Sequence, residues 1–170
     1  MAIPQPTERL RFREMGPTDL GEMAALLGDP LVMTFYPAPM TRDQAAGWIT
    51  WNQDNYRRYG FGLWVLETHD GSFVGDCGIT WQRVNGQPRL EVGYHVRADL
   101  QGRRFATEAA MAARDFARDM VRAEELIAIT HPQNAASQRV AEKLGMRLLE
   151  NDLGEDGVVH WVHGMRLHSA

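Results

Sequence analysis

The stretch that decides the fold is LEVGYHVRADLQGRRFATEA, residues 90–109. Apolar residues alternate up to Val96, a turn containing Gly102 follows, and a helix lined with small residues begins after it. The free backbone N–H groups and the dipole at a helix N-terminus form an anion site that suits a pyrophosphate, and Arg103 and Arg104 add positive charge beside it. An ordinary strand, turn and helix with a solvated basic turn would show the same pattern, so these residues alone leave both interpretations open.

The sequence upstream predicts one strand, two helices and an antiparallel meander. Residues 8–14 alternate as a strand does, and Pro17 then opens a helix that Gly28 closes. A capping box that begins at Thr41 opens the second helix, which is expected to run to about Arg58. Three strands joined by tight turns follow, and they are expected over 62–67, 73–83 and 89–96.

The sequence downstream predicts two helices and three further strands. The first helix, over 103–120, carries on one face the residues Ala106, Ala110, Ala113, Ala117 and Met120. The second helix is expected over 134–144, and the strands over 126–130, 146–150 and 158–167. This order predicts an α+β, or mixed α/β, fold with helices on the faces of a sheet. We expect a single domain over 1–170, with its core between 8 and 168.

The composition excludes several classes of protein. The 18 Lys and Arg against 22 Asp and Glu give a net charge of −4, whereas a nucleic-acid binder normally carries a basic excess. The single cysteine, Cys77, cannot form an internal disulfide and favours a reducing compartment. No apolar run approaches the ~18 residues of a membrane span, and the N-terminus lacks the pattern of a secretory signal. We therefore expect a soluble, cytoplasmic protein that binds neither nucleic acid nor membrane.

Two motifs together resemble those of the GNAT acyltransferase superfamily. Glu91-Val-Gly-Tyr-x-Val, followed by Gln101-Gly-Arg-Arg-Phe-Ala-Thr-Glu-Ala, is similar to its coenzyme A motif. Asn134-Ala-Ala-Ser-x-Arg-Val-x-x-Lys-Leu-Gly-Met resembles the second motif of the branch that contains the ribosomal-protein N-terminal acetyltransferases. One position departs from the pattern. The family usually has Gln/Arg-x-x-Gly-x-Gly/Ala, and Arg104 stands at the first glycine position.

The resemblance implies a mostly antiparallel, twisted sheet of about six or seven strands, with acetyl-CoA as the acyl donor. Tyr94, His95 and Val96 would pair their backbone with the pantetheine arm. Asn134 would bond the pantetheine amides, and Ser137 would lie close to the thioester. The residues expected to surround the pyrophosphate are Gln101, Gly102, Arg103, Arg104, Phe105, Ala106 and Thr107.

The reaction that the resemblance implies is transfer of an acetyl group to an amine by direct attack on the thioester. A lysine side chain has a pKa of about 10.4 and an α-amine about 8, so a base must first remove a proton. Glu91 is the expected base; alternatively, it is an exposed strand carboxylate paired with Arg89 or another cation. Many family members have a tyrosine acid where this sequence has Ala141. Ser137 is the expected substitute, either donating to the leaving sulfur or binding the coenzyme, and the alternative is a helix-surface serine.

The residues that would bind the acceptor amine are Tyr36, Trp48 and Trp81, because they belong to segments that wall the acceptor groove in the family. The branch suggests a protein N-terminus as acceptor, and a polyamine, an amino acid or an aminoglycoside are alternatives. The competing hypothesis is a non-catalytic acyl-CoA-binding module, motivated by Arg104 and Ala141. The chain is expected to be a monomer or a homodimer.

Histidines in the sequence give no sign of a metal site. His160 and His163 are three residues apart on a predicted strand and therefore face opposite sides of it. His95 is expected to contact the coenzyme through its backbone, with its side chain turned outward, although a role in proton relay is also open. We expect no metal.

Overall fold

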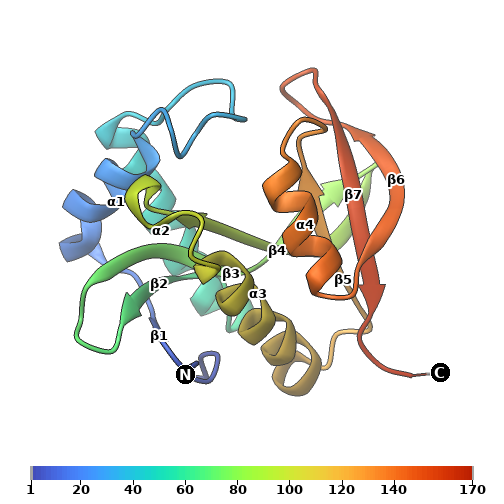
Figure 1. Ribbon diagram of the computed structural model, residues 1–170, viewed down its shortest axis with the longest axis horizontal. Coiled ribbons are helices and arrows are strands. Elements are labelled where there is room, and N and C mark those ends of the chain that lie inside the picture. Colours follow the sequence, from blue (N-terminus) through green and yellow to red (C-terminus); the bar gives the residue numbers. More distant parts are fainter. Residues whose placement is uncertain (1, 170) are drawn as a thin grey trace.

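The computed structural model describes residues 2–169 and shows a seven-stranded twisted sheet between layers of helices (Figure 1). The strand order is β1-β2-β3-β4-β5-β7-β6, and every neighbouring pair is antiparallel except β4 with β5. The strands are β1 (Leu10–Arg13), β2 (Leu63–Thr68), β3 (Phe73–Val84), β4 (Gln87–Val96), β5 (Glu125–Thr130), β6 (Arg147–Leu153) and β7 (Val159–Arg166). The predicted mixed α/β fold with a mostly antiparallel sheet is confirmed. A single domain over 1–170 stays a prediction, and Met1 and Ala170 lie outside the described residues.

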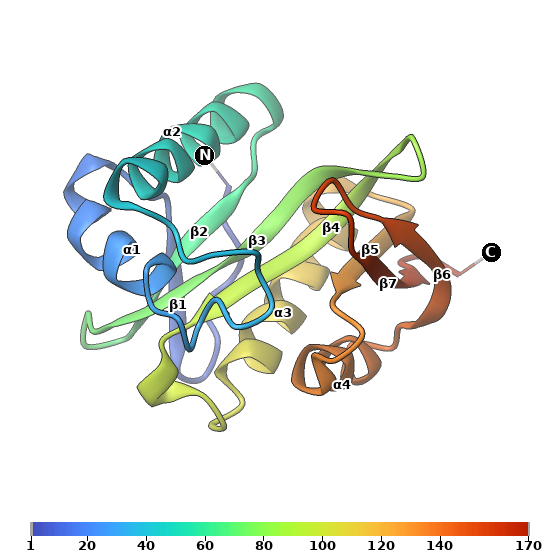
Figure 2. The same cartoon turned by 90° about the horizontal axis from the view of Figure 1, so that it is seen from above.

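Within residues 2–169 four α-helices cover the sheet, and Figure 2 shows α1 and α2 on one face and α3 and α4 on the other. Their bounds are α1 (Leu20–Leu27), α2 (Arg42–Tyr59), α3 (Phe105–Phe116) and α4 (Ala135–Lys143). Side chains on β4 confirm the two faces. His95 packs against Trp48 of α2, whereas the next side chain back, Tyr94, bonds to Ser137 of α4. Successive residues of a strand point to opposite faces, so α2 and α4 lie on opposite sides of the sheet.

Local signals in the sequence set several of these boundaries. Thr41 caps α2 through the predicted capping box, in which its hydroxyl accepts the N–H of Gln44. Asn85 and Gly86 both take positive φ, 48° and 81°, which is what the two-residue turn between β3 and β4 requires. In the core, Trp64 of β2 is 1% exposed and packs against the rings of Tyr56 of α2 and Phe116 of α3. The meander and its helices are therefore joined through one apolar core.

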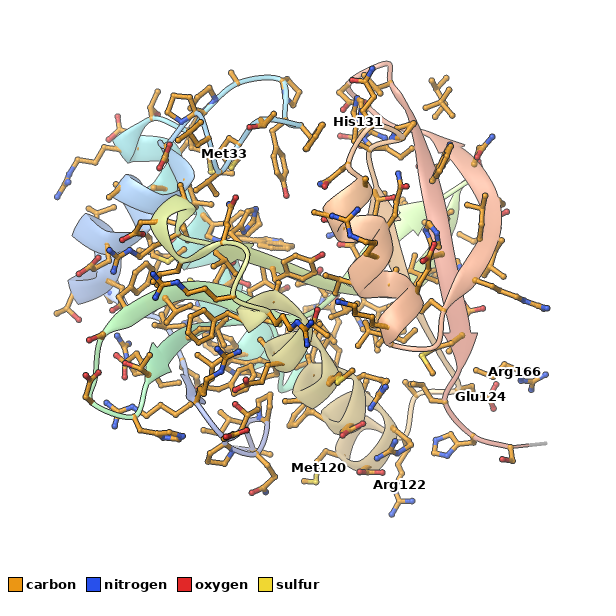
Figure 3. The ribbon with its side chains drawn as sticks, in the orientation of Figure 1. Met33, Met120, Arg122, Glu124, His131 and Arg166 are labelled. Atoms are coloured by element: carbon orange, nitrogen blue, oxygen red, sulfur yellow. The ribbon has the colours of Figure 1, made fainter. Side chains whose placement is uncertain are left out.

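The helix predicted over 103–120 needs correction at both ends. It begins at Phe105, and its last turn, Ala117–Val121, is a π-helix rather than an α-helix. The wider turn rotates the following side chains, so Met120 leaves the face that buries Ala110 and Ala113. Met120 is 61% exposed and points away from the core in Figure 3. Placing Met120 on the buried face was wrong.

Within residues 2–169, no helix combines the length and the apolar character that crossing a bilayer would need.

Candidate active site

The site lies where the two parallel strands of the sheet diverge. β4 and β5 pair at Glu91 and Ile127 and separate beyond that point. The Glu91 side chain reaches across the opening, where its Oε2 atom accepts the backbone N–H of Ile129 at 3.2 Å. This opening is a slot through the sheet, because the cavities that meet there are lined by side chains from both faces.

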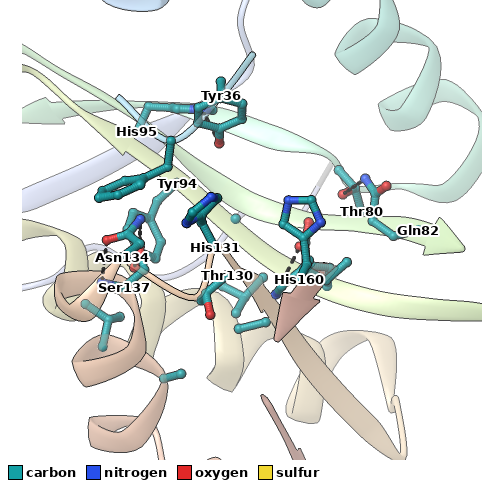
Figure 4. Close-up of a pocket in the computed structure, with 18 of the residues that line it drawn as sticks. Tyr36, Thr80, Gln82, Tyr94, His95, Thr130, His131, Asn134, Ser137 and His160 are labelled. Carbon is teal, nitrogen blue, oxygen red and sulfur yellow. Dashed lines mark hydrogen bonds between the residues drawn. The ribbon is translucent and has the colours of Figure 1, made fainter. Parts of the chain in front are cut away.

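Two cavities meet at the slot. The first, of about 380 Å³, lies toward α2 and has aromatic walls; we call it the aromatic cavity (Figure 4). The second, of about 500 Å³, runs along the turn before α3 and one side of α4; we call it the turn cavity. The residues that line both are Phe35, Tyr36, Tyr94, His95, Asn134, Ser137 and Val140. The two cavities therefore adjoin each other at these residues.

The aromatic cavity combines apolar walls with negative charge. Its walls include the rings of Phe35, Tyr36, Trp48 and Trp51, and its carboxylates come from Glu91 and from Asp156, whose Oδ2 lies 3.4 Å from His160 Nε2. Among its described lining residues there is no Lys or Arg. Such a cavity favours a cation with an apolar body, because aromatic faces and carboxylates both attract positive charge.

Glu91 occupies the inner wall of the aromatic cavity. Burial raises the pKa of its carboxyl to about 7, while the N–H of Ile129 and the nearby His95 pull it the other way. The alternative partner considered for it, Arg89, is instead bonded to Glu125 and Glu150. Glu91 therefore has no cation paired to it among the described residues, and its pKa lies where a general base at neutral pH is effective.

A small hydroxyl network stands on the α4 side of the slot. Tyr94 donates its hydroxyl hydrogen to Ser137 Oγ at 3.0 Å, and Asn134 Nδ2 donates to the same oxygen at 3.1 Å. Because Ser137 Oγ accepts twice, its own hydrogen is left to donate into the cavity. Asn134 Oδ1 caps α4 by accepting the N–H of Ser137, so this side chain also fixes the helix start. Burial raises the pKa of Tyr94 to about 12, which keeps it a hydrogen donor.

His95 differs from its prediction. Its side chain is 6% exposed and points inward, where Nδ1 lies 2.8 Å from Asp76 Oδ1 and Nε2 lies 2.9 Å from the Tyr36 hydroxyl. The outward orientation was wrong, because Asp76 lies directly opposite on β3 and holds the ring. Trp48 donates its Nε1–H to the second Asp76 oxygen at 3.1 Å. No local pattern signals this network, since its members are joined only by strand pairing and loop packing.

The turn before α3 contains the residues that were predicted to surround the pyrophosphate. Gly102 and Arg104 have positive φ, 77° and 65°, so Arg104 takes a left-handed backbone conformation, which glycine adopts without strain. The predicted residues that line the turn cavity are Gln101, Gly102, Arg104, Phe105, Ala106 and Thr107. Arg103 does not line it, and its carbonyl accepts a hydrogen bond from Arg9.

Two cations at this cavity were missed. Arg139 and Lys143 lie one turn apart on α4 and line the turn cavity opposite Arg104. Arg139 and Lys143 are four residues apart in the helix that Asn134 begins, and this spacing places both on one helix face. That spacing was the signal available in the sequence. The turn cavity thus collects positive charge from two elements.

The structure does not bring together the three residues predicted to bind the acceptor amine. Tyr36 and Trp48 line the aromatic cavity, whereas Trp81 lines neither of these cavities and is 43% exposed. Thr80 and Gln82 line the cavity, so strand alternation turns Trp81 to the opposite face. Including Trp81 in the groove was wrong for that reason. Within the described part of the chain there is also no cluster of three or more His, Cys, Asp or Glu suited to a metal ion.

Comparison with known proteins identifies the class that this fold and site define. A family model described as an acetyltransferase (GNAT) domain matches residues 9–147, and the chain belongs to this family. It is an acetyl-CoA-dependent N-acetyltransferase that takes acetyl-CoA as co-substrate.

The chain is also similar to individual proteins. It is 39% identical over 142 residues to the uncharacterized protein YkkB of Bacillus subtilis, covering 82% of this chain and 83% of that one. An acetyltransferase from Agrobacterium tumefaciens superposes with a TM-score of 0.85 at 25% identity, over 99% and 96% of the two chains. The fold is shared with yncA of Salmonella typhimurium, solved with its cofactor acetyl-CoA, at a TM-score of 0.72 and 18% identity over 95% of each chain.

Proposed function

We propose that this protein acetylates a cationic primary amine, on a small molecule or at a protein N-terminus, by direct attack of the amine on the thioester of acetyl-CoA. The observation that carries the proposal is the junction of the two cavities at Tyr94 and Ser137. A donor in the turn cavity and an acceptor in the aromatic cavity can meet through the slot, so no covalent enzyme intermediate is needed. Holding the two reactants together in this way supplies a large part of the rate enhancement.

The turn cavity is the proposed coenzyme site. The diphosphate would lie at the N-terminus of α3, near the backbone N–H groups of residues 102–107 and the guanidinium of Arg104. Arg139 and Lys143 would face the same phosphates from α4. The pantetheine arm would follow the free edge of β4 at residues 94–96, toward Asn134 and Ser137.

Glu91 is the proposed general base. An ammonium group must lose a proton before it can attack, and a carboxyl group with a pKa of about 7 can take that proton near neutral pH. Ser137 is the proposed donor to the leaving sulfur, because Tyr94 and Asn134 direct its hydrogen into the cavity. Glu91 on β4 and Ser137 on α4 line the cavities that meet at the slot, so the base would face the attacking nitrogen while the donor faces the sulfur of the tetrahedral intermediate.

The charge of the aromatic cavity sets the proposed acceptor class. Glu91 and Asp156 without a Lys or Arg in the described lining favour amines with no carboxylate of their own. A cavity of about 380 Å³ accommodates a polyamine, an aminoglycoside ring or the first residues of a protein N-terminus, and disfavours a free amino acid. A cytoplasmic location and a monomeric or homodimeric state complete the proposal.

The first test is release of free thiol from acetyl-CoA with a panel of amines, using the wild-type protein, Glu91→Gln and Ser137→Ala. We expect a cationic amine to support turnover. Glu91→Gln should lower kcat by about 100-fold or more, and Ser137→Ala by about 10-fold, while both still bind acetyl-CoA. Glu22→Gln, an exposed carboxylate on α1, is the matched control and should leave kcat unchanged.

The competing function, a non-catalytic acyl-CoA-binding module, makes a different prediction. It is favoured if acetyl-CoA raises the melting temperature of the protein while no amine in the panel releases thiol. If acetyl-CoA produces no stabilisation at all, neither function survives. Full turnover by Glu91→Gln at saturating acceptor would remove Glu91 as the base.

A further inference from the structure

A chain of three polar groups leads from the core of the protein to the junction of the two cavities. Asp76 on β3 and His95 on β4 are cross-strand partners, and Tyr36 comes from the loop between α1 and α2. Asp76 is fully buried and lies 2.8 Å from His95 Nδ1, while His95 Nε2 lies 2.9 Å from the Tyr36 hydroxyl. Burying a charged group in this way costs desolvation free energy, and apolar side chains would pack these positions more favourably.

The direction of each hydrogen bond follows from the donors and acceptors present. The Asp76 carboxylate can only accept, so His95 carries its hydrogen on Nδ1, and the second Asp76 oxygen takes the Nε1–H of Trp48. In the neutral imidazole, Nε2 must then accept, and the Tyr36 hydroxyl donates to it. The lone pairs of the Tyr36 oxygen remain free toward the cavities that this residue lines.

The proposed transfer of an acetyl group from acetyl-CoA to a primary ammonium needs two proton acceptors. A primary ammonium, R–NH3+, loses one proton before it attacks and a second once its nitrogen is bonded to the acetyl carbon. Glu91 accounts for the first of these protons. The second remains, because Ser137 is a hydrogen donor to the leaving sulfur and cannot also take a proton from nitrogen.

We propose, as an extension of that function, that Tyr36 carries the second proton to His95 and that Asp76 stabilises the imidazolium. As the N–H bond of the tetrahedral intermediate breaks, its electron pair returns to nitrogen and the proton passes to the Tyr36 oxygen. The Tyr36 hydrogen passes at the same time to His95 Nε2. The C–S bond then breaks, and the electron pair leaves with the coenzyme A thiolate, next to the Ser137 hydroxyl. Tyr36 is a catalytic residue in this scheme, and His95 and Asp76 act through it.

The surroundings of His95 suit a proton acceptor. Burial by itself lowers the pKa of the imidazole, but Asp76 and Glu91 raise it more, so the net pKa lies above the ordinary 6.5. The titratable groups that face the ring are Asp76 from β3, Glu91 from β4 and Tyr36 from the loop, while α2 contributes the uncharged Trp48. The Tyr36 ring is 48% exposed at the rim, but its hydroxyl reaches inward, where burial and the nearby carboxylates raise its pKa. Tyr36 therefore stays protonated between proton transfers.

The experiment is the pH dependence of kcat/KM between pH 5 and 9, with the cationic amine that the wild-type protein uses best. In the wild type, log kcat/KM should rise with a limiting slope of two on the acidic side, because Glu91 and His95 must both be unprotonated. Tyr36→Phe and His95→Gln should each reduce the slope to one and lower kcat by about 100-fold, with the KM for acetyl-CoA unchanged within about twofold. Asp76→Asn should lower the pKa of His95, because the imidazolium loses its carboxylate partner. The part of the acidic limb that His95 contributes should then shift to lower pH.

Matched controls separate a proton-transfer role from a structural one. Tyr59→Phe removes an exposed hydroxyl at the end of α2, and His168→Gln removes an exposed imidazole near the C-terminus; both should keep a slope of two. A rise in the melting temperature of each variant on addition of acetyl-CoA shows that the variant is folded and binds the coenzyme. If the wild type is active but Tyr36→Phe or His95→Gln keeps the wild-type kcat and slope, the relay is overturned and the acetyltransferase function stands. If the folded wild type acetylates no amine, it is the proposed function that fails.

Discussion

Arg104 occupies a left-handed backbone position, with φ of 65°, at the residue that caps α3. This conformation brings the Cβ of an L-residue close to its own backbone and costs roughly 1 kcal/mol, a penalty that glycine avoids. The side chain is exposed and lines the turn cavity. Under the proposed function, contact between the Arg104 guanidinium and a phosphate group of acetyl-CoA would offset this strain.

Arg104→Gly should therefore separate stability from coenzyme binding. We expect the melting temperature of the free protein to rise by up to about 2–4 °C, because the strain disappears. The Kd for acetyl-CoA should rise by about 3- to 10-fold, because one charge-assisted contact to phosphate is lost. Arg103→Ala removes a neighbouring charge outside the cavity and should change this Kd by less than about twofold. Equal losses of affinity in both variants would show that only the summed charge of the turn matters.

At the scale of elements, β3 can approach β2 closely because Gly78 has no side chain. A Cβ atom at Gly78 would lie 2.0 Å from the carbonyl oxygen of Gly62. Its cross-strand partner on β4 is Gly93, where there is room for a side chain. A Cβ atom added at Gly93 would have its nearest contact at 3.7 Å, with a Leu63 methyl group. The approach at Gly78 holds the meander in place, and the meander carries both Asp76 and Glu91.

Gly78→Ala should lower the free energy of unfolding by about 3 kcal/mol, because the backbone has to shift to relieve the overlap. Gly93→Ala adds the same methyl group to the facing position and should cost less than about 1 kcal/mol. Urea unfolding followed by tryptophan fluorescence measures both. If the two variants are equally stable, the contact with Gly62 does not determine how β2 and β3 pack.

At the scale of the whole molecule, carboxylates affect stability in two opposite ways. Arg13 lowers the pKa of Asp19, and for Glu67 and Glu108 burial is outweighed by hydrogen bonds from Arg13, Arg11, Thr7 and Arg9. These groups stabilise the fold above about pH 4.5 and lose that contribution as the pH falls through their folded-state pKa. Glu91 behaves oppositely, because its pKa in the folded protein is raised to about 7. The fold binds the Glu91 proton more tightly than the unfolded chain does, so stability is lost as the pH rises from about 4.5 to 7.

Glu91→Gln should therefore be more stable relative to the wild type at pH 8 than at pH 4.5. The change in this difference should be up to about 3 kcal/mol, since it corresponds to a pKa difference between about 4.5 and about 7. Urea unfolding of both proteins at the two pH values measures it, and the contributions of ionisable groups that do not interact with Glu91 cancel. Glu22→Gln should show no such change. A constant difference between Glu91→Gln and the wild type would mean that the carboxyl is not destabilised by burial.

The sequence by itself determined the order of elements and much of the turn cavity. Capping at Thr41, the Asn85-Gly86 turn and the change of apolar period after Val96 are local signals, because each depends on residues a few positions apart. The coenzyme motif was equally local, which is why six of its seven predicted turn residues line the cavity.

Only the tertiary structure decided the chemistry of the aromatic cavity. Asp76, His95 and Tyr36 come from separate segments, and the register of β3 against β4 with the packing of the loop after α1 brings them together. The side to which Met120 points likewise depended on the π-helical turn. The side to which Trp81 points depended on which face of β3 borders the slot. Periodicity shows that a residue alternates or repeats, but which face becomes a cavity depends on contacts between segments distant in the chain.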